Sequence, residues 1–239
     1  MPTSLELIIQ SLPFLLTGVL QTLKVTLIAV AIGCILGLFG GMGRLSKNRF
    51  LRGLATCYVD FVRGTPLLVQ LFIVYFGLPP VIQEFKIFLA TSFALGPFTS
   101  TSHIPPFVAA VAACSINSGA YVSEIFRAGI QSIEKGQQEA ALSLGMTPKQ
   151  AMRHIILPQA FRRVIPPLGN EFIAMLKDTS LLICIGYAEL TRQGQLIIGT
   201  TFRPFEIWFA VAFLYLIMTL SISRLVDYTE KRLDTNGNH

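Results

Sequence analysis

The charged side chains of residues 170–180, NEFIAMLKDTS, are the ones in this sequence best suited to act on a polar molecule. Glu171 and Asp178 lie seven residues apart and share one face of a helix, and Lys177 precedes Asp178. A carboxylate on that face can accept hydrogen bonds from an ammonium group. The neighbouring polar residues Asn170 and Thr179 would belong to the same path. The set is therefore a candidate for a polar helix face that lines a path for a polar solute.

The sequence lacks the common motifs of enzymatic chemistry. The sequence contains no GxxxxGK[ST] phosphate-binding loop and no zincin motif. Its histidines are scattered, at His103, His154 and His239. Its cysteines lie singly in or beside apolar segments, without metal-ligand spacing: Cys34, Cys57, Cys114 and Cys184. We interpret the cysteines as packing residues and expect no catalytic residue, metal or cofactor on this chain.

The composition indicates an integral membrane protein. Charged residues make up 13% of the chain, about half the fraction of a soluble domain. Residues 25–43, 64–83 and 104–123 contain no Asp, Glu, Lys or Arg, and each run is long enough to cross about 30 Å of hydrocarbon. A shorter run, 207–223, can be completed by its flanks. The first run follows Glu6 instead of a basic cluster and is too long for a signal peptide.

Basic residues fix the expected topology. Arg44, Lys47, Arg49 and Arg52 separate the first two runs, and Arg127, Lys135, Lys149, Arg153, Arg162 and Arg163 follow the third. The positive-inside rule places both segments and the basic C-terminal tail in the cytoplasm, which accounts for the net charge of +6 without a nucleic-acid partner. A further crossing between Pro166 and about Ala188 is then required. If that helix began later than Pro166, the charges of residues 171–178 would lie at the cytoplasmic interface instead of on the path.

The sequence thus predicts an all-α membrane protein with one domain, residues 1–239, whose core covers about 14–228. The five transmembrane helices are expected at about 17–43, 57–83, 104–126, 166–188 and 204–225. The N-terminus would lie outside and the C-terminus in the cytoplasm, with a cytoplasmic loop at 127–165.

Two local sequence patterns predict further features of the first two spans. Gly33, Gly37 and Gly41 recur every four residues, a spacing that lets another helix approach closely. Asp60 and Arg63 lie three residues apart and could pair on a helix surface. Pro66 follows them, which predicts a kink or a late helix start. Arg63 and Gln70, on either side of this proline, are further candidates for the solute path.

Residues 139–158, EAALSLGMTPKQAMRHIILP, predict a pair of short helices inside the cytoplasmic loop. Gly145 suits the left-handed residue that ends the first helix. Thr147 suits an N-cap, with Pro148 at the first helical position and Gln150 completing a capping box. Leu157-Pro158 is expected to end the second helix. Such a pair could be a DNA-binding unit, a connector or a docking element for a cytoplasmic partner.

The same residues carry a family resemblance. Glu139-Ala140-Ala141, Gly145 and Ile155-Ile156-Leu157-Pro158 match every fixed position of EAA-x3-G-x9-I-x-L-P. This pattern resembles the EAA signature of binding-protein-dependent ABC importer permeases. RGTPLLVQLF at 63–72, NSGAYVSEIFRAGIQSI at 117–133 and LGNEFIAMLKDTSLL at 168–182 are similar to the polar amino acid branch of that family.

The resemblance implies a type I ABC importer fold and a coupling helix, residues 139–144, seated in a groove of an ATPase subunit. The residues that would take part in coupling are Glu139, Ala140, Ala141, Leu142, Leu144, Gly145, Ile155, Leu157 and Pro158. It also implies a cytoplasmic ATPase dimer that binds ATP and Mg²⁺, a second permease subunit that is a copy or a sister, an extracytoplasmic solute-binding protein, and a bacterial inner or plasma membrane.

Two other classes of function stay open at this point. An ion-coupled transporter or channel would work without an ATPase. A membrane-tethered DNA regulator would use the helix pair, although the loop 127–165 leaves no room for the small domain that DNA binding needs.

Overall fold

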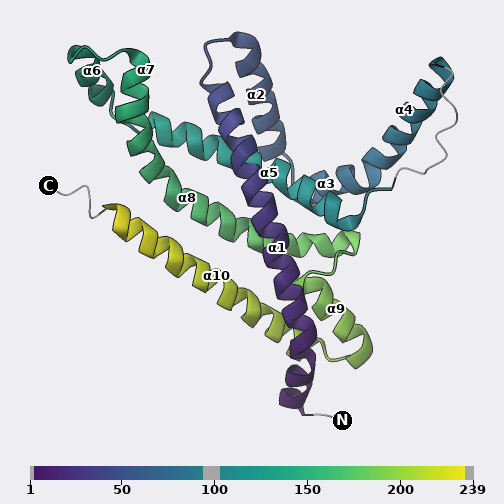
Figure 1. Cartoon of the computed structure of the whole chain (residues 1–239). Helices are drawn as coiled ribbons and strands as arrows, with labels where there is room; N and C mark the ends of the chain where they lie inside the picture. Colours follow the sequence, from purple (N-terminus) through teal and green to yellow (C-terminus); the bar gives the residue numbers. More distant parts are fainter. Residues whose placement is uncertain (1–2, 94–102, 235–239) are drawn as a thin grey trace.

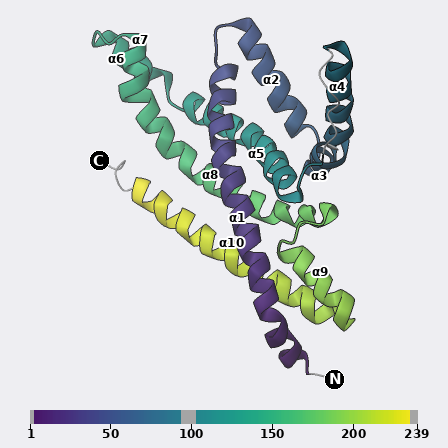
Figure 2. The same ribbon diagram turned by 45° about the vertical axis from the view of Figure 1, so that its right-hand side comes forward.

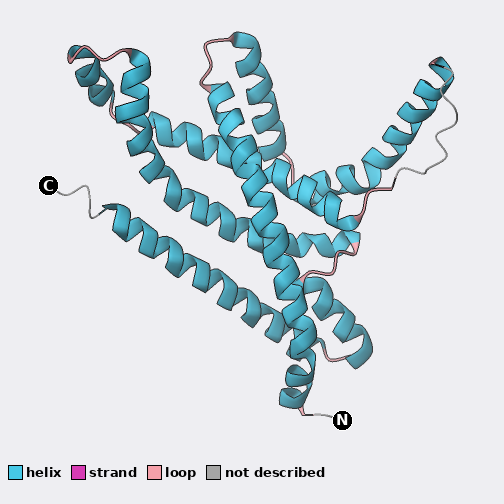
Figure 3. Cartoon of the chain, viewed as in Figure 1, coloured by secondary structure: helices cyan, strands magenta, loops and turns pink. Residues whose placement is uncertain are grey.

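The structure, a computed structural model, describes residues 3–93 and 103–234, and its regular elements in these ranges are all helical (Figure 3). The α-helices are α1 Ser4–Arg44, α2 Arg49–Arg63, α3 Leu67–Phe72, α4 Leu78–Ser92, α5 Pro106–Gln131, α6 Lys135–Ser143, α7 Pro148–Ala151, α8 Leu157–Asp178, α9 Leu190–Thr201 and α10 Pro204–Asp234. Two π-helical turns, Ile73–Gly77 and Met152–Ile156, and a 3-10 helix, Thr179–Ile185, join some of them. The predicted all-α class is confirmed. His239 lies outside the described residues.

Four helices in the described part of the chain are long and apolar enough to cross a membrane: Ser4–Arg44, Leu67–Ser92, Pro106–Gln131 and Pro204–Arg232. They correspond to the first, second, third and fifth predicted spans. α8, which covers most of the predicted fourth span, is not in this set because it carries several charged residues, among them Glu171, Lys177 and Asp178. The five-crossing topology therefore stays a prediction. α8 also begins at Leu157, nine residues before the Pro166 expected from the sequence.

α1 is the longest helix and crosses α5, α8 and α10 in both views (Figures 1 and 2). Its glycines allow the close contact with α5. A Cβ atom on Gly33 would lie 2.8 Å from Ser118 Cβ, and one on Gly37 would lie 2.6 Å from Val122 Cβ. Gly41 in turn faces the Ser123 carbonyl. This close approach is what the four-residue spacing predicts.

α8 packs between α5 and α10 and runs opposite to both. Its Val164 lies against Gly129 near the end of α5, while its Gly169 lies against Val226 near the end of α10. Deeper in the bundle, Met175 belongs to a buried cluster with Ala113 of α5. α8 is thereby fixed along its whole length.

Both π-helical turns immediately precede a Leu-Pro pair. The N–H of Leu157 donates to the Met152 carbonyl and that of Leu78 to the Ile73 carbonyl, each five residues back. A proline has no N–H, and its ring collides with the carbonyl four residues earlier in an α-helix. A wider turn relieves that collision, so the chain stays helical from Pro148 to Asp178. The prediction that Leu157-Pro158 ends the second helix is wrong for this reason.

The second predicted span, 57–83, is divided. α2 ends at Arg63, and Pro66 is the N-cap from which α3 begins, so the late start predicted at Pro66 is confirmed.

The interpretation of the cysteines holds only in part. Cys114 is buried and Cys34 is half-buried, but Cys57 and Cys184 are exposed on this chain. Apolar neighbours in the sequence do not reveal on which face of a helix a residue lies.

Candidate functional site

The helix pair of residues 139–158 projects from the bundle at the junction of α5 and α8 (Figure 1). Gly145 has a φ of 81°, in the left-handed region that glycine adopts without strain. Thr147 caps α7, and Gln150 completes a capping box with it. Both features follow the sequence prediction.

Most of the signature residues on this pair face outward. Ala141 is buried, whereas Glu139, Ala140 and Gly145 are exposed and Leu144 is 81% exposed. Leu142 is also exposed. At the base, Ile156 packs with Ile133 and Ala160, with Ile155 alongside. Leu157 is half-buried and Pro158 exposed at the start of α8. The pair is thus a firmly seated element with an apolar, outward-facing tip.

An open groove of about 670 Å³ lies where α5, α8 and the end of α2 meet. Arg63, Asn170 and Glu171 line it, as do Tyr121 and Glu124. A second hollow of about 330 Å³ adjoins it through Tyr121 and Glu171 and reaches Asp178. Four of the six candidate path residues therefore line these two adjoining hollows, Asp178 only the second of them.

The other two candidates lie elsewhere. Thr179 is fully buried and donates to the Leu176 carbonyl. Gln70 is buried at the break between α2 and α3, where its Nε2 donates to the carbonyls of Val62 and Thr65 at 2.7 and 3.0 Å. Its amide oxygen accepts from Asn117 at 3.0 Å. Both residues support the walls of the groove without lining it.

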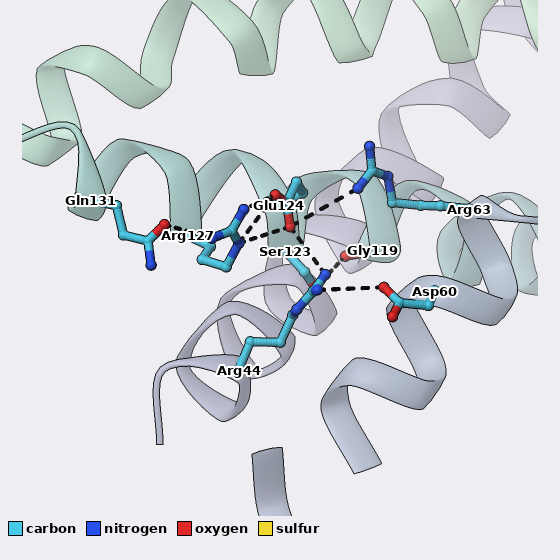
Figure 4. Close-up of polar contacts among 8 residues, drawn as sticks. All are labelled: Arg44, Asp60, Arg63, Gly119, Ser123, Glu124, Arg127 and Gln131. Carbon is cyan, nitrogen blue, oxygen red and sulfur yellow. Dashed lines mark hydrogen bonds and ion pairs between the residues drawn. The ribbon is translucent and has the colours of Figure 1, made fainter. Parts of the chain in front are cut away.

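One wall of the groove is charged, and Glu124 is at its centre with Arg44, Arg63 and Arg127 around it. The sequence interpretation did not single out Glu124. Figure 4 shows its carboxylate among three guanidinium groups. Arg44 lies at 3.1 Å and Arg63 at 4.0 Å, and Arg127 also forms an ion pair with it. These contacts join the ends of α1, α2 and α5.

The predicted pair between Asp60 and Arg63 is wrong. Asp60 lies 3.4 Å from Arg44, whereas Arg63 turns to Glu124 and covers the ring of Tyr121. Sequence spacing identified both residues as charged partners but not the helices that supply their counterions. The available signal was Glu124 itself, the sole acid between residues 104 and 126.

Glu171 has no ion pair in the described part of the chain. Neither Arg63 nor Lys177, two cations that could pair with it and merely hold helices together, is within ion-pair distance of its carboxylate. It is half-buried and borders both hollows. A carboxylate in this position is placed to meet a cation that enters the groove.

Glu189 is a second acid that sequence reasoning missed. It is fully buried and caps α9 by accepting from the N–H groups of Thr191 and Arg192, both at 2.9 Å. The hydroxyl of Tyr215 on α10 donates to it at 2.9 Å. It holds helices together and lies outside the groove. In the described ranges no group of three or more His, Cys, Asp or Glu side chains is arranged to hold a metal ion.

Comparison with known proteins agrees with this architecture. Residues 29–235 match the family described as "Binding-protein-dependent transport system inner membrane component". The chain is 42% identical to the glutamine transport system permease protein of Escherichia coli K12 over 223 residues, 93% of this chain and 94% of that one. It is equally identical, over 93% of this chain and 87% of the relative, to the L-cystine transport system permease protein of Bacillus subtilis 168.

A solved structure gives the same result for the fold. The crystal structure of an amino acid ABC transporter with histidines has a chain 42% identical to this one, with a TM-score of 0.82 over 94% of this chain and 96% of that chain. The helices are therefore arranged as in an ABC importer permease. The chain belongs to the family of binding-protein-dependent transport system inner membrane components.

Proposed function

We propose that this chain is the permease subunit of an ATP-driven, binding-protein-dependent ABC importer for polar amino acids in a bacterial cell membrane. Family membership and the amino acid transport named for its relatives support the class of protein and of substrate. The relatives are named for different amino acids, so the particular substrate is not assigned. ATP hydrolysis is expected on a separate ATPase subunit, because the chain lacks a phosphate-binding loop.

α6 is the proposed coupling helix. Leu142 and Leu144 present apolar surface at its exposed end, and Ala140 is small enough for close approach by a partner. The buried contact of Ile156 with Ile133 fixes the base of the pair. An ATPase groove that receives this tip would exert its force on a rigid element.

The observation that carries the proposal is the unbroken helical path from the turn after α6 to the groove. Residues 148–178 stay helical through the π-helical turn, a distance of roughly 46 Å at about 1.5 Å per residue. Asn170 and Glu171 lie on the same helix and line the groove. A displacement at Thr147 would therefore reach the groove without crossing a flexible joint.

The groove is the proposed part of the substrate path. Arg63 offers a cation for a carboxylate, and Glu171 offers an acceptor for an ammonium group. The groove is open on one side, so a second permease subunit is needed to enclose it. An extracytoplasmic solute-binding protein would deliver the amino acid to the assembled pair.

The test is ATP-driven uptake by the chain reconstituted with its ATPase subunit and binding protein. Glu139→Lys should abolish uptake and weaken co-purification of the ATPase, because it reverses a charge on the docking surface. Gly145→Glu should do the same, because a side chain is strained at a φ of 81°. Gly199→Glu is the matched control, since that position of α9 is open and lies far from α6.

Normal uptake by both α6-region variants would remove the docking proposal. Ion-driven uptake by the chain alone would instead favour the alternative class, an ion-coupled transporter or channel that works without an ATPase.

A further inference from the structure

One face of α2 packs on the rest of the chain. Ala55 meets Gly43 of α1, Tyr58 donates to the Ile116 carbonyl of α5 at 2.7 Å, and Val59 and Val62 are buried. This inward face fixes the helix beside the end of α1 (Figures 1 and 2). The outward side of α2 is not covered by residues of the described chain.

A second face is an apolar stripe. Phe50, Leu54 and Phe61 are 73%, 55% and 60% exposed, and the exposed Cys57 lies between them. Steps of three and four residues place all four on one side of the helix. From Phe50 to Phe61 the stripe is roughly 16 Å long at about 1.5 Å per residue. That length corresponds to one leaflet, half of about 30 Å of hydrocarbon.

Cations gather at one end of this stripe. Lys47, Arg49 and Arg52 are exposed, and Arg49 and Arg52 lie three residues apart on the helix surface. Within the described residues none of the three forms an ion pair, whereas Arg44 and Arg63 nearby are both paired with acids. The first acidic residue after Arg44 is Asp60, near the other end of α2.

We propose that α2 is a binding site for an anionic phospholipid of the cytoplasmic leaflet. Lys47, Arg49 and Arg52 bind the phosphate and headgroup, and an acyl chain lies along Phe50, Leu54 and Phe61. Two features favour a lipid over a protein partner. The apolar stripe matches the depth of a leaflet, and the unpaired cations stand only at its headgroup end. The anionic charge of the headgroup complements these cations.

The experiment purifies the chain from bacterial membranes in mild detergent and measures by native mass spectrometry which phospholipids remain bound. Phosphatidylglycerol is then exchanged against phosphatidylcholine of the same acyl composition. The wild-type chain should retain phosphatidylglycerol preferentially. Arg49→Gln and Arg52→Gln should each reduce that retention about fivefold, because an interfacial Lys or Arg contributes about 1 kcal/mol to binding an anionic surface.

Arg224→Gln is the matched control, since Arg224 is also exposed on a candidate span and lies three residues before the acid Asp227 on α10. It should leave lipid retention unchanged. Phe50→Ala with Leu54→Ala should lower retention of both lipids, which separates the acyl contact from the headgroup contact.

Equal retention of the two lipids by the wild-type chain would overturn the proposal, as would equal loss in the Arg224→Gln control. Size-exclusion chromatography with light scattering measures the number of permease subunits in the particle. If the Arg49→Gln and Arg52→Gln pair changed the number of permease subunits in the particle, the face would be a subunit interface and the lipid site would be rejected. None of these readouts depends on transport.

Discussion

Asn117 of α5 donates a 3.0 Å hydrogen bond to the side-chain oxygen of Gln70, whose own amide group bonds the carbonyls of Val62 and Thr65 on the far side of a helix break. One buried amide thus ties the end of α2, the start of α3 and the middle of α5. The break itself exists because Pro66 cannot continue a helix from residue 65. Gln70 sets the angle at which α2 leaves and therefore the position of Arg63 in the groove.

Gln70→Leu should destabilise the chain. The substitution leaves two carbonyls and the Asn117 amide without their buried partner, and an unsatisfied buried group costs about 1–3 kcal/mol. The midpoint of thermal unfolding in detergent, followed by size-exclusion chromatography, measures the effect. Gln10→Leu is the matched control, because Gln10 is exposed on α1. Equal midpoints for the two variants would show that the amide does not hold the break.

The contact between α1 and α5 predicts that one substitution destabilises the chain and that a second substitution partly compensates for it. Gly37→Ala places a Cβ 2.6 Å from Val122 Cβ, so one of the helices must shift, at a cost of about 1–3 kcal/mol for overpacking. Val122→Ala removes Cγ1, the atom nearest to the new Cβ, but keeps the Val122 Cβ position, so the double variant should recover only part of the lost stability.

Gly53→Ala is the reference for this pair. Nothing lies within 4 Å of a Cβ at that position of α2, so alanine should stabilise the helix by about 0.5–1 kcal/mol. The thermal midpoints of these four variants and of the wild-type chain test the prediction. Additive effects of Gly37→Ala and Val122→Ala would contradict a direct collision.

The features that the sequence predicted correctly depend on neighbours along the chain. The capping box of Thr147 and Gln150 is satisfied within one turn, as is the left-handed Gly145. Pro66 interrupts the helix in which it would otherwise lie, so its effect is also local. The glycine spacing on α1 describes a face of a single helix, and that was enough to predict a close contact, although not that α5 would make it.

The features that it missed depend on segments far apart in the chain. Glu124 is 80 residues from Arg44, so nothing local showed that α1 would supply its counterion. Glu189 is bonded by Tyr215, 26 residues away. At Leu157-Pro158 a local rule was correct in general but failed here. Tertiary packing of Ile156 holds the helix through the proline, and a π-helical turn absorbs the steric conflict.

Glu124→Gln should loosen the ends of α1, α2 and α5. Without the carboxylate, Arg44, Arg63 and Arg127 face one another, and the loss of hydrogen bonds to a charged group costs about 1.5–3 kcal/mol. Added salt should recover part of the thermal midpoint, because counterions screen the repulsion.

Asp60→Asn is the control for this wall. In the described part of the chain the Asp60 carboxylate forms an ion pair with Arg44, and its side chain is 60% exposed, so the variant should lose no more than about 1 kcal/mol. If the two variants behaved alike at low and high salt, Glu124 would not be the centre of the charged wall.

Glu171 is the acid with the strongest case for contact with the substrate. It borders both hollows of the groove and has no ion pair within the described residues, so neutralising it breaks no structural contact between charges. Glu171→Gln keeps the size and hydrogen-bonding capacity of the side chain but removes the negative charge that would attract an ammonium group. We expect the variant to assemble with its ATPase subunit and to lose substrate-stimulated ATPase activity by about tenfold, the factor that corresponds to 1.4 kcal/mol.

The measurement is ATPase activity in proteoliposomes with and without the loaded binding protein, together with uptake and co-purification of the subunits. Glu230→Gln, at an exposed position near the end of α10, is the control and should leave all three unchanged. A collapse of assembly in Glu171→Gln would make this residue a structural one, because the groove could then not form. Full stimulation with unchanged uptake would lead to the same conclusion, since a path residue cannot lose its charge without effect on a charged solute. Selective loss of stimulation and uptake, with assembly intact, is the result that places Glu171 on the path.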